Sequence, residues 1–167
     1  MRFTTEQRYP LAPDAVAAAY ADPGLYASFR GLTKLTEAEV LEHSPEGARV
    51  TMHVRYRFGG HLSPAAHAVL DPSRLTWVER SVHDLEQRTT TFTMVPDHYG
   101  DRFSCHGRYR FEPAADGTVR YGEGELTVRA LLVGRAVEGA IVSGLREHLE
   151  EEAPQVTAYI TGGSAPA

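Results

Sequence analysis

The segment that decides the fold is GELTVRALLVGRAVEGAIVSGLREHLEEE, residues 124–152, which reads as a strand running directly into one long helix. Apolar residues recur in it at helical spacing, the pattern of a helix with one buried face: Val133, Val137, Ile141, Leu145 and Leu149. The spacing predicts a helix from about Leu132 to Glu152. Pro154 is expected to kink or end this helix, because proline donates no backbone hydrogen bond and clashes with the preceding turn.

Small residues form a second stripe on the same helix. Gly139 and Gly144 lie in its interior, and each costs about 1 kcal/mol of helix propensity relative to alanine. Together with Gly144, Ala136 and Ala140 are spaced for one helix face. Such a stripe predicts either a close approach to the neighbouring element or space for a bound molecule, and the residues alone leave both alternatives open.

Upstream of the helix, apolar and polar residues alternate with period two, which is typical of half-buried strands in an antiparallel sheet. The alternation is clearest at residues 49–58 and 102–112. Turn signals separate the further strands that we expect, at 34–43, 65–70, 75–83, 86–95 and 118–129. No helical pattern interrupts the run, so consecutive hairpins are expected rather than βαβ units.

The first ten residues are expected to form one more strand, and two helix-start signals follow them. Pro13 with Asp14 predicts a first short helix, because proline and an acid both favour the first helical turn. Asp22 before Pro23 predicts a second, since an acidic N-cap then precedes a proline at the first helical position.

One strand register can be predicted, for the hairpin of residues 102–112 and 118–129. Placing Arg108 opposite Glu123 also places His106 opposite Glu125, and both pairs gain favourable cross-strand charge on the outer face. The inner face of the same register pairs Tyr109 with Gly122, Gly107 with Gly124 and Phe103 with Val128. The small stripe of the long helix is expected to face the inner glycines.

This order of elements resembles the helix-grip fold of the START-like (SRPBCC) superfamily, which includes the birch-pollen allergen relatives and the polyketide cyclases. The opening RFTTEQRYPLAPDAVAAAYADPGLYASF is similar to the family's strand-then-helix start. The ending GEGELTVRALLVGRAVEGAIVSGL is similar to that of an uncharacterised bacterial family within the superfamily. The resemblance predicts an α+β protein: a curved antiparallel sheet of seven or eight strands wrapped on a long C-terminal helix, with two short helices after the first strand. One domain is expected at 1–160, and a flexible tail at 161–167.

The resemblance further implies an apolar cavity between sheet and helix that holds a lipid, a polyketide or another hydrophobic small molecule. The residues expected to line it come from the inner faces of the strands and from the small stripe of the helix: Met52, Val54, Tyr56, Phe58, Trp77, Phe92, Met94, Cys105, Tyr109, Ala136, Ala140 and Gly144. An ordinary filled core is the competing interpretation of the same residues.

Binding without catalysis is the leading hypothesis, because no catalytic signature is present. The alternative is a polyketide cyclase or aromatase-like enzyme, with Tyr56, Glu79 and Tyr109 as the candidate catalytic groups. Glu79 shares a strand face with Trp77; if that face is inward, the pKa of the carboxyl should rise unless it is paired. A face of the opposite phase, with Glu79 at the rim or outside, is equally compatible with the sequence. A second alternative is a protein-interaction module with a filled core.

Composition excludes several other classes. The net charge of −5 argues against a nucleic-acid partner. Cys105 is the single cysteine, so it forms no disulfide within the chain. The eight histidines lack compact metal-ligand spacing, so neither a metal nor another cofactor is expected. The N-terminus has no signal-peptide pattern and no apolar run is long enough to span a membrane, so we expect a cytoplasmic monomer or homodimer.

Overall fold

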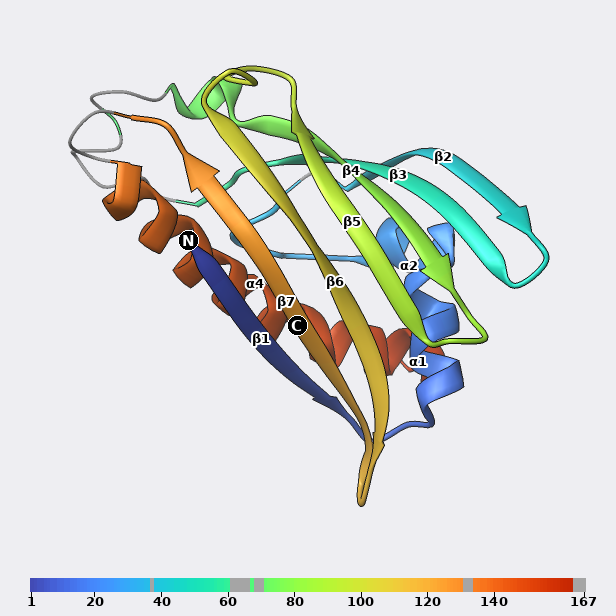
Figure 1. The fold of residues 1–167 in the computed structure, drawn as a ribbon. Coiled ribbons are helices and arrows are strands. Elements are labelled where there is room, and N and C mark those ends of the chain that lie inside the picture. The colour runs from blue at the N-terminus through green and yellow to red at the C-terminus, as the bar shows by residue number, and fades with distance from the viewer. Residues whose placement is uncertain (37, 61–66, 68–70, 131–133, 164–167) are drawn as a thin grey trace.

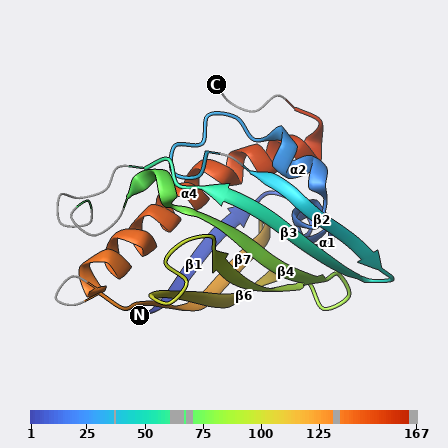
Figure 2. The same ribbon diagram turned by 90° about the horizontal axis from the view of Figure 1, so that it is seen from above.

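The computed structural model describes residues 1–36, 38–60, 67, 71–130 and 134–163. A seven-stranded sheet, in the order β1-β7-β6-β5-β4-β3-β2, curves along one long helix, α4 (Figures 1 and 2). Neighbouring strands are all antiparallel. The predicted helix-grip architecture, with two short helices after the first strand, is therefore confirmed.

The strands are β1 (Arg2–Tyr9), β2 (Glu39–Glu46), β3 (Arg49–Arg57), β4 (Thr76–Asp84), β5 (Thr89–Pro96), β6 (Phe103–Ala114) and β7 (Gly117–Val128). The helices are α1 (Pro13–Tyr20), α2 (Pro23–Ser28), the short 3-10 helix η1 (Pro72–Arg74) and α4 (Gly134–Thr161). Both N-terminal start signals work as predicted: a proline opens α1, and the Asp22 carboxylate caps α2 by accepting from the Gly24 amide. Both short helices lie at the end of the sheet where α4 ends (Figure 2).

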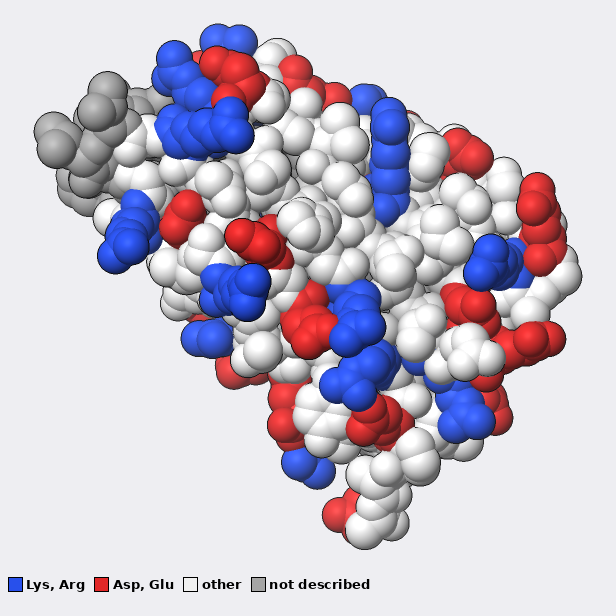
Figure 3. Space-filling view, in the orientation of Figure 1, with Lys and Arg blue, Asp and Glu red and all other residues white. Residues whose placement is uncertain are grey.

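The predicted register of the β6–β7 hairpin is confirmed. Arg108 pairs with Glu123 and His106 with Glu125 on the outer face, while Gly107 pairs with Gly124 on the inner face. The Arg108 guanidinium also hydrogen-bonds the Glu123 carboxylate. Such pairs are part of an outer sheet surface on which basic and acidic side chains are interspersed (Figure 3).

Aromatic rings cover the two paired glycines of the inner face. A Cβ built on Gly124 would lie 2.5 Å from the Phe3 ring, and one on Gly107 would lie 2.8 Å from the Phe92 ring. Phe3 is the register partner of Gly124, and Phe92 is that of Gly107. The prediction that the small stripe of the long helix faces these glycines is therefore wrong, because the neighbouring strands fill the space above them.

We expect Gly107→Ala to lower the free energy of unfolding by about 1–3 kcal/mol through overpacking. The added Cβ would lie 2.3 Å from the Glu123 carbonyl oxygen and 2.9 Å from the Gly124 Cα, and backbone atoms cannot turn aside. Urea unfolding followed by circular dichroism measures the loss. Gly100→Ala is the matched control, because no atom lies within 4 Å of a Cβ built there; equal stability of the two variants would contradict the prediction.

The last helix is longer than predicted and runs through Pro154 without ending. Contacts beyond the proline stabilise the added turns. Gln155 hydrogen-bonds the backbone amide and carbonyl of Arg30 at 2.9 and 2.8 Å, and Val156 is completely buried. The Tyr159 hydroxyl donates to Asp22 at 2.7 Å. These tertiary contacts offset the hydrogen bond that proline cannot make.

Strand boundaries also differ from the prediction at the sheet edge. The strand expected at 34–43 is β2, and it continues to Glu46 past Pro45. Proline is tolerated there because β2 is an edge strand, so one side of its backbone has no partner strand. The turn follows at Gly47, which has a positive φ of 61°. The strand expected at 65–70 lies outside the described residues, apart from residue 67.

Candidate functional site

Glu79 lies on the inner face of the sheet, in the middle of a row of apolar side chains. It pairs with Val54 on one side and Met94 on the other, and the row continues to Cys105 and Leu126. Along β4 the buried residues Ser81 and His83 share its phase, whereas Arg80 and Val82 are exposed. Of the two phases that the sequence left open for Glu79, the structure therefore has the inward one.

Aromatic side chains flank this row. On one side, the Tyr56 and Trp77 rings pack with centroids 6.0 Å apart. On the other side, Phe92 and Tyr109 stack at 5.1 Å. Tyr26 from α2 belongs to the same buried cluster. The inner face is thus largely apolar and aromatic around a single carboxyl group.

The predicted lining residues of the sheet lie together, but those of the helix do not. Six strand residues are buried: Met52, Val54, Tyr56, Phe92, Cys105 and Tyr109. Phe58, Trp77 and Met94 are partly buried. On α4, Ala136 and Ala140 are exposed, and Gly144 is partly exposed with no atom within 4 Å of a built Cβ.

Ala136 and Ala140 were predicted to line the cavity because they are small, and this part of the prediction is wrong. The buried face of α4 includes Val142 and Leu149, but also several polar residues: Glu138, His148, Glu152 and Gln155. With 3.6 residues per turn, that face lies opposite the two alanines. The predicted apolar stripe is inward, with Val137 and Leu149 buried and Ile141 and Leu145 packed against the core, whereas the stripe of small residues is not.

A buried ionic cluster, which the sequence analysis missed, joins α4 to the sheet. Arg120 on β7, His148 and Glu152 are each at most 6% exposed. The Arg120 Nη1 donates to Gln7 Oε1 at 2.6 Å and lies 3.4 Å from Glu152 Oε1. His148 Nε2 lies 3.2 Å from Glu152 Oε2, and the Tyr20 hydroxyl donates to Glu152 as well.

Tyrosine rings enclose the same arginine. The Arg120 guanidinium carbon lies 3.9 Å from the Tyr20 ring centroid and 3.6 Å from that of Tyr109. A signal for this residue existed in the sequence, because the predicted register puts Arg120 in phase with Gly122 on the inner face. A lone arginine in that phase predicts a buried cation that requires partners.

The two inward carboxyl groups have opposite pKa shifts. Burial raises the pKa of Glu79 to about 7, although the positive charge of Arg120 opposes the shift. Burial would also raise the pKa of Glu152, but its hydrogen bond to His148 and the charges of His148 and Arg120 outweigh it and hold the pKa at about 2. Glu152 is thus a firmly ionised structural group, whereas Glu79 changes its charge near neutral pH.

Several inward polar groups have no hydrogen-bond partner among the residues that the structure describes. The Glu79 carboxylate, the Tyr56 hydroxyl and the Tyr109 hydroxyl accept or donate no hydrogen bond there. Trp77 Nε1 is also buried without a partner, as are Arg120 Nε and His148 Nδ1. Buried polar groups in proteins are nearly always hydrogen-bonded, so these three buried nitrogens are exceptions in the described part of the chain.

Other chemical candidates on the inner face are inert. His83 is hydrogen-bonded by Ser81 and Thr90, both at 3.0 Å, and burial lowers its pKa to about 4. Burial, followed by the charge of Glu79, raises the pKa of the Cys105 thiol to about 12, so the reactive thiolate does not form at neutral pH. In the described part of the chain, no three His, Cys, Asp or Glu residues are placed to hold a metal ion.

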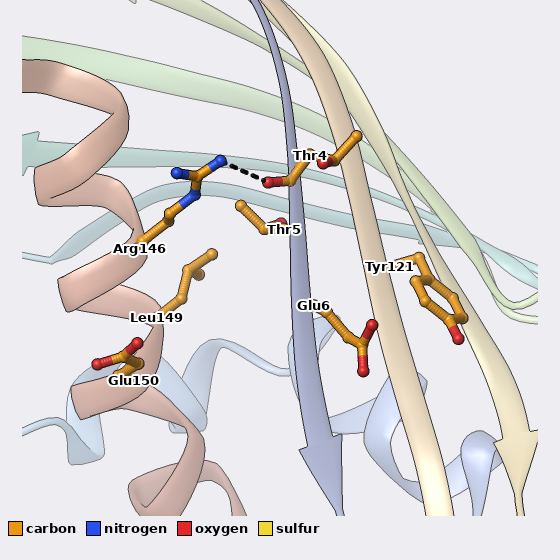
Figure 4. Close-up of a pocket in the computed structure, with 7 residues that line it drawn as sticks. All are labelled: Thr4, Thr5, Glu6, Tyr121, Arg146, Leu149 and Glu150. Atoms are coloured by element: carbon orange, nitrogen blue, oxygen red, sulfur yellow. Dashed lines mark hydrogen bonds between the residues drawn. The ribbon is translucent and has the colours of Figure 1, made fainter. Parts of the chain in front are cut away.

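A groove that the structure describes lies elsewhere, between β1 and α4 (Figure 4). Its volume is about 420 Å³, and its lining is Thr4, Thr5, Glu6, Tyr121, Arg146, Leu149 and Glu150. The Arg146 side chain donates to the Thr4 carbonyl across it at 3.4 Å. None of the predicted cavity residues contributes to this open groove. No helix in the described residues is long and apolar enough to cross a membrane.

Seven antiparallel strands curved along one long helix, with two short helices after the first strand and a polar cluster inside, define a helix-grip protein of the START-like class. Within this class, the chain belongs to the DUF2505 family, described as proteins of unknown function, whose model matches residues 4–160. The resemblance seen in the sequence is therefore confirmed.

Solved structures of the same fold include TTHA0849 from Thermus thermophilus, with a TM-score of 0.67, 18% identity, and 97% and 98% of the two chains covered. The Zhui aromatase/cyclase of a Streptomyces species has a TM-score of 0.68 and 13% identity over 98% of each chain. Norcoclaurine synthase of Thalictrum flavum has a TM-score of 0.63 and 17% identity, over 96% of this chain and 86% of the synthase. No curated protein sequence matches the chain. Identities this low show a common fold alone.

Proposed function

We propose that the protein binds a small, largely apolar molecule between the inner face of the sheet and α4. The observation that carries the proposal is the set of inward polar groups without hydrogen bonds among the described residues, namely those of Glu79, Tyr56 and Tyr109, beside a row of apolar side chains. A ligand site has this composition: apolar walls with a few convergent polar groups that fix the orientation of the ligand.

Energetics support a bound molecule over a permanently filled core. Leaving a buried polar group without a hydrogen bond costs about 1–3 kcal/mol, and Trp77 Nε1 is such a group among the described residues. A ligand with an apolar body and a few polar atoms would supply the missing hydrogen bonds. It would also bury its own apolar surface, at about 25 cal/mol per Å².

Catalysis is the second candidate, and one observation favours it. An effective general acid or base has a pKa near the working pH, and the pKa of Glu79 lies at about 7. With the neutral hydroxyls of Tyr56 and Tyr109 nearby, this carboxyl group could move a proton on a bound carbonyl compound, as the cyclase alternative requires.

A protein-interaction module is supported less well. The large apolar side chains that are exposed among the described residues are Met1, Leu41 and Val82. Leu41 lies on β2 and Val82 on β4, with β3 between them, while Met1 precedes β1 at the opposite edge of the sheet. They form no continuous apolar patch of the kind that marks a docking surface.

The proposal is tested by native mass spectrometry of the protein purified from its own host. We expect a co-purified small molecule in the wild type, reduced at least several-fold in Tyr56→Phe. Tyr121→Phe is the matched control, because Tyr121 lies on the outer phase of β7 and beside the groove of Figure 4. A ligand that is lost from Tyr121→Phe but kept by Tyr56→Phe would place binding in that groove and contradict the proposal.

A further inference from the structure

Glu79 is a carboxylate that the fold leaves without a cation. Among the described residues, the charges that act on it belong to Arg120, Glu152 and His148, and none of them forms a hydrogen bond or ion pair with it. Its strand neighbours Val54 and Met94 are apolar. An ionised carboxylate in such surroundings is unfavourable until a positive charge is brought to it.

Arg120 is the buried cation whose charge acts most on the pKa of Glu79, but it already has other partners. Its Nη1 donates to Gln7 and lies 3.4 Å from Glu152, while Tyr20 and Tyr109 cover the guanidinium at 3.9 and 3.6 Å. Among the described residues, no hydrogen bond or ion pair joins this side chain to Glu79. The fold therefore does not offer this guanidinium as a partner for Glu79.

Among the interior carboxylates that the structure describes, Glu152 and Glu138 have ion-pair partners and Glu79 has none. Glu152 is balanced by Arg120, and His148 is hydrogen-bonded to the same carboxylate. Glu138 is balanced by the N-terminal ammonium at 3.5 Å. His83 stays neutral because burial lowers its pKa to about 4. Glu79 is thus the described interior carboxylate without an ion-pair partner.

Aromatic rings surround this charge. Tyr26 of α2 belongs to the same buried cluster, and burial, followed by the charge of Glu79, raises the pKa of its hydroxyl. Tyr56 and Trp77 occupy the adjacent row of the sheet, and Tyr109 also responds to Glu79. Aromatic faces attract organic cations, with about 2 kcal/mol or more available when the site is desolvated.

On the basis of the proposed function, we infer that the molecule bound on the inner face carries a positively charged amine, which pairs with Glu79 beside the rings of Tyr56 and Trp77. The rest of that molecule is apolar, since its neighbours on the sheet are Val54, Met94 and Phe92. An anionic ligand would instead add a second uncompensated negative charge beside the carboxylate.

Three aromatic probes of matched size test the inference: naphthylmethylamine, naphthylmethanol and naphthoic acid. Isothermal titration calorimetry at about pH 8, where Glu79 is ionised and the amine is protonated, measures their affinities for the full chain. We expect the amine to bind at least about tenfold more tightly than the alcohol, and the acid to bind most weakly. In Glu79→Gln the amine and alcohol should bind about equally, whereas Glu123→Gln, which removes an outer-face carboxylate, should keep the wild-type preference.

The pH profile is a second readout that a general loss of structure would not imitate. Affinity for the amine should rise between about pH 6 and pH 8, as Glu79 loses its proton. A neutral ligand held by the protonated carboxyl would show the opposite trend.

Binding of the alcohol as tightly as the amine, or a preference for the amine that survives in Glu79→Gln, overturns the inference but leaves the proposed function standing. A co-purified molecule without a basic nitrogen would likewise overturn the inference and leave the proposed function standing. Failure of all three probes to bind, together with the absence of any co-purified molecule, overturns the proposed function and the inference with it.

Discussion

Replacing Arg120 by methionine is expected to lower the free energy of unfolding by about 3–5 kcal/mol, the range for removing one partner of a buried ion pair. The substitution leaves the Glu152 carboxylate, which is 5% exposed, without its guanidinium. It also removes the hydrogen bond to Gln7 and the cation between the Tyr20 and Tyr109 rings. Urea unfolding followed by circular dichroism measures the loss.

Two further variants establish that the loss comes from the buried charge. In Arg120→Met/Glu152→Gln the uncompensated carboxylate is gone. The double variant should therefore lose less free energy of unfolding than the sum of the losses in the two single variants, by at least about 1 kcal/mol. Arg108→Met is the matched surface control, because its partner Glu123 is on the outer face and exposed pairs contribute about 0–1 kcal/mol. A loss below about 1 kcal/mol in Arg120→Met would show that the cluster does not stabilise the fold.

The sheet could be predicted because its side chains alternate between water and the interior. Once Arg108 and Glu123 are placed opposite each other, every other pair of the β6–β7 hairpin follows, including Gly107 with Gly124. A shift by one residue would turn every inward side chain outward. The register also predicted the inward phase of Tyr109, and it contained the inward phase of Arg120, although the sequence analysis did not draw that conclusion.

The polar part of the buried face of α4 could not be predicted in the same way. Polar residues such as His148 and Glu152 occupy its buried face, and their partners Tyr20 and Arg120 come from α1 and β7, far away in the sequence. Apolar periodicity therefore gave the helix and its inward apolar stripe, but not the polar residues that share the buried face. The continuation of α4 through Pro154 could not be predicted either, because it depends on contacts of the following turn with Asp22 and Arg30.

Glu79→Gln is expected to change the pH dependence of stability, because Glu79 destabilises the folded protein near neutral pH. Burial raises the pKa of this carboxyl from 4.5 to about 7. The folded state therefore holds the proton more tightly than the unfolded state, and the stability linked to this group is complete below about pH 4.5 and is lost as the pH rises to about 7. The expected slope in this window is up to about 1.4 kcal/mol per pH unit.

His83 has the opposite effect over nearly the same window. Burial, with the positive charge of Arg120, lowers its pKa from 6.5 to about 4. The folded state keeps the imidazole neutral, so its stability is complete above about pH 6.5 and is lost as the pH falls to about 4. Between about pH 4.5 and pH 6.5 the two contributions oppose each other, and together they leave the wild type with little net slope.

Variants that lack either Glu79 or His83 show how the other group changes the free energy of unfolding with pH. In Glu79→Gln only the His83 contribution remains, so the free energy of unfolding should rise with pH between about pH 5 and pH 6.5. In His83→Gln it should fall over the same range, since only the Glu79 contribution remains. Glu152 does not interfere, because its folded and unfolded pKa values, about 2 and 4.5, both lie below the window. Urea unfolding at half-unit pH steps measures the slopes, and parallel curves for wild type and Glu79→Gln would show that Glu79 is not the buried, unpaired carboxyl on which the ligand proposal depends.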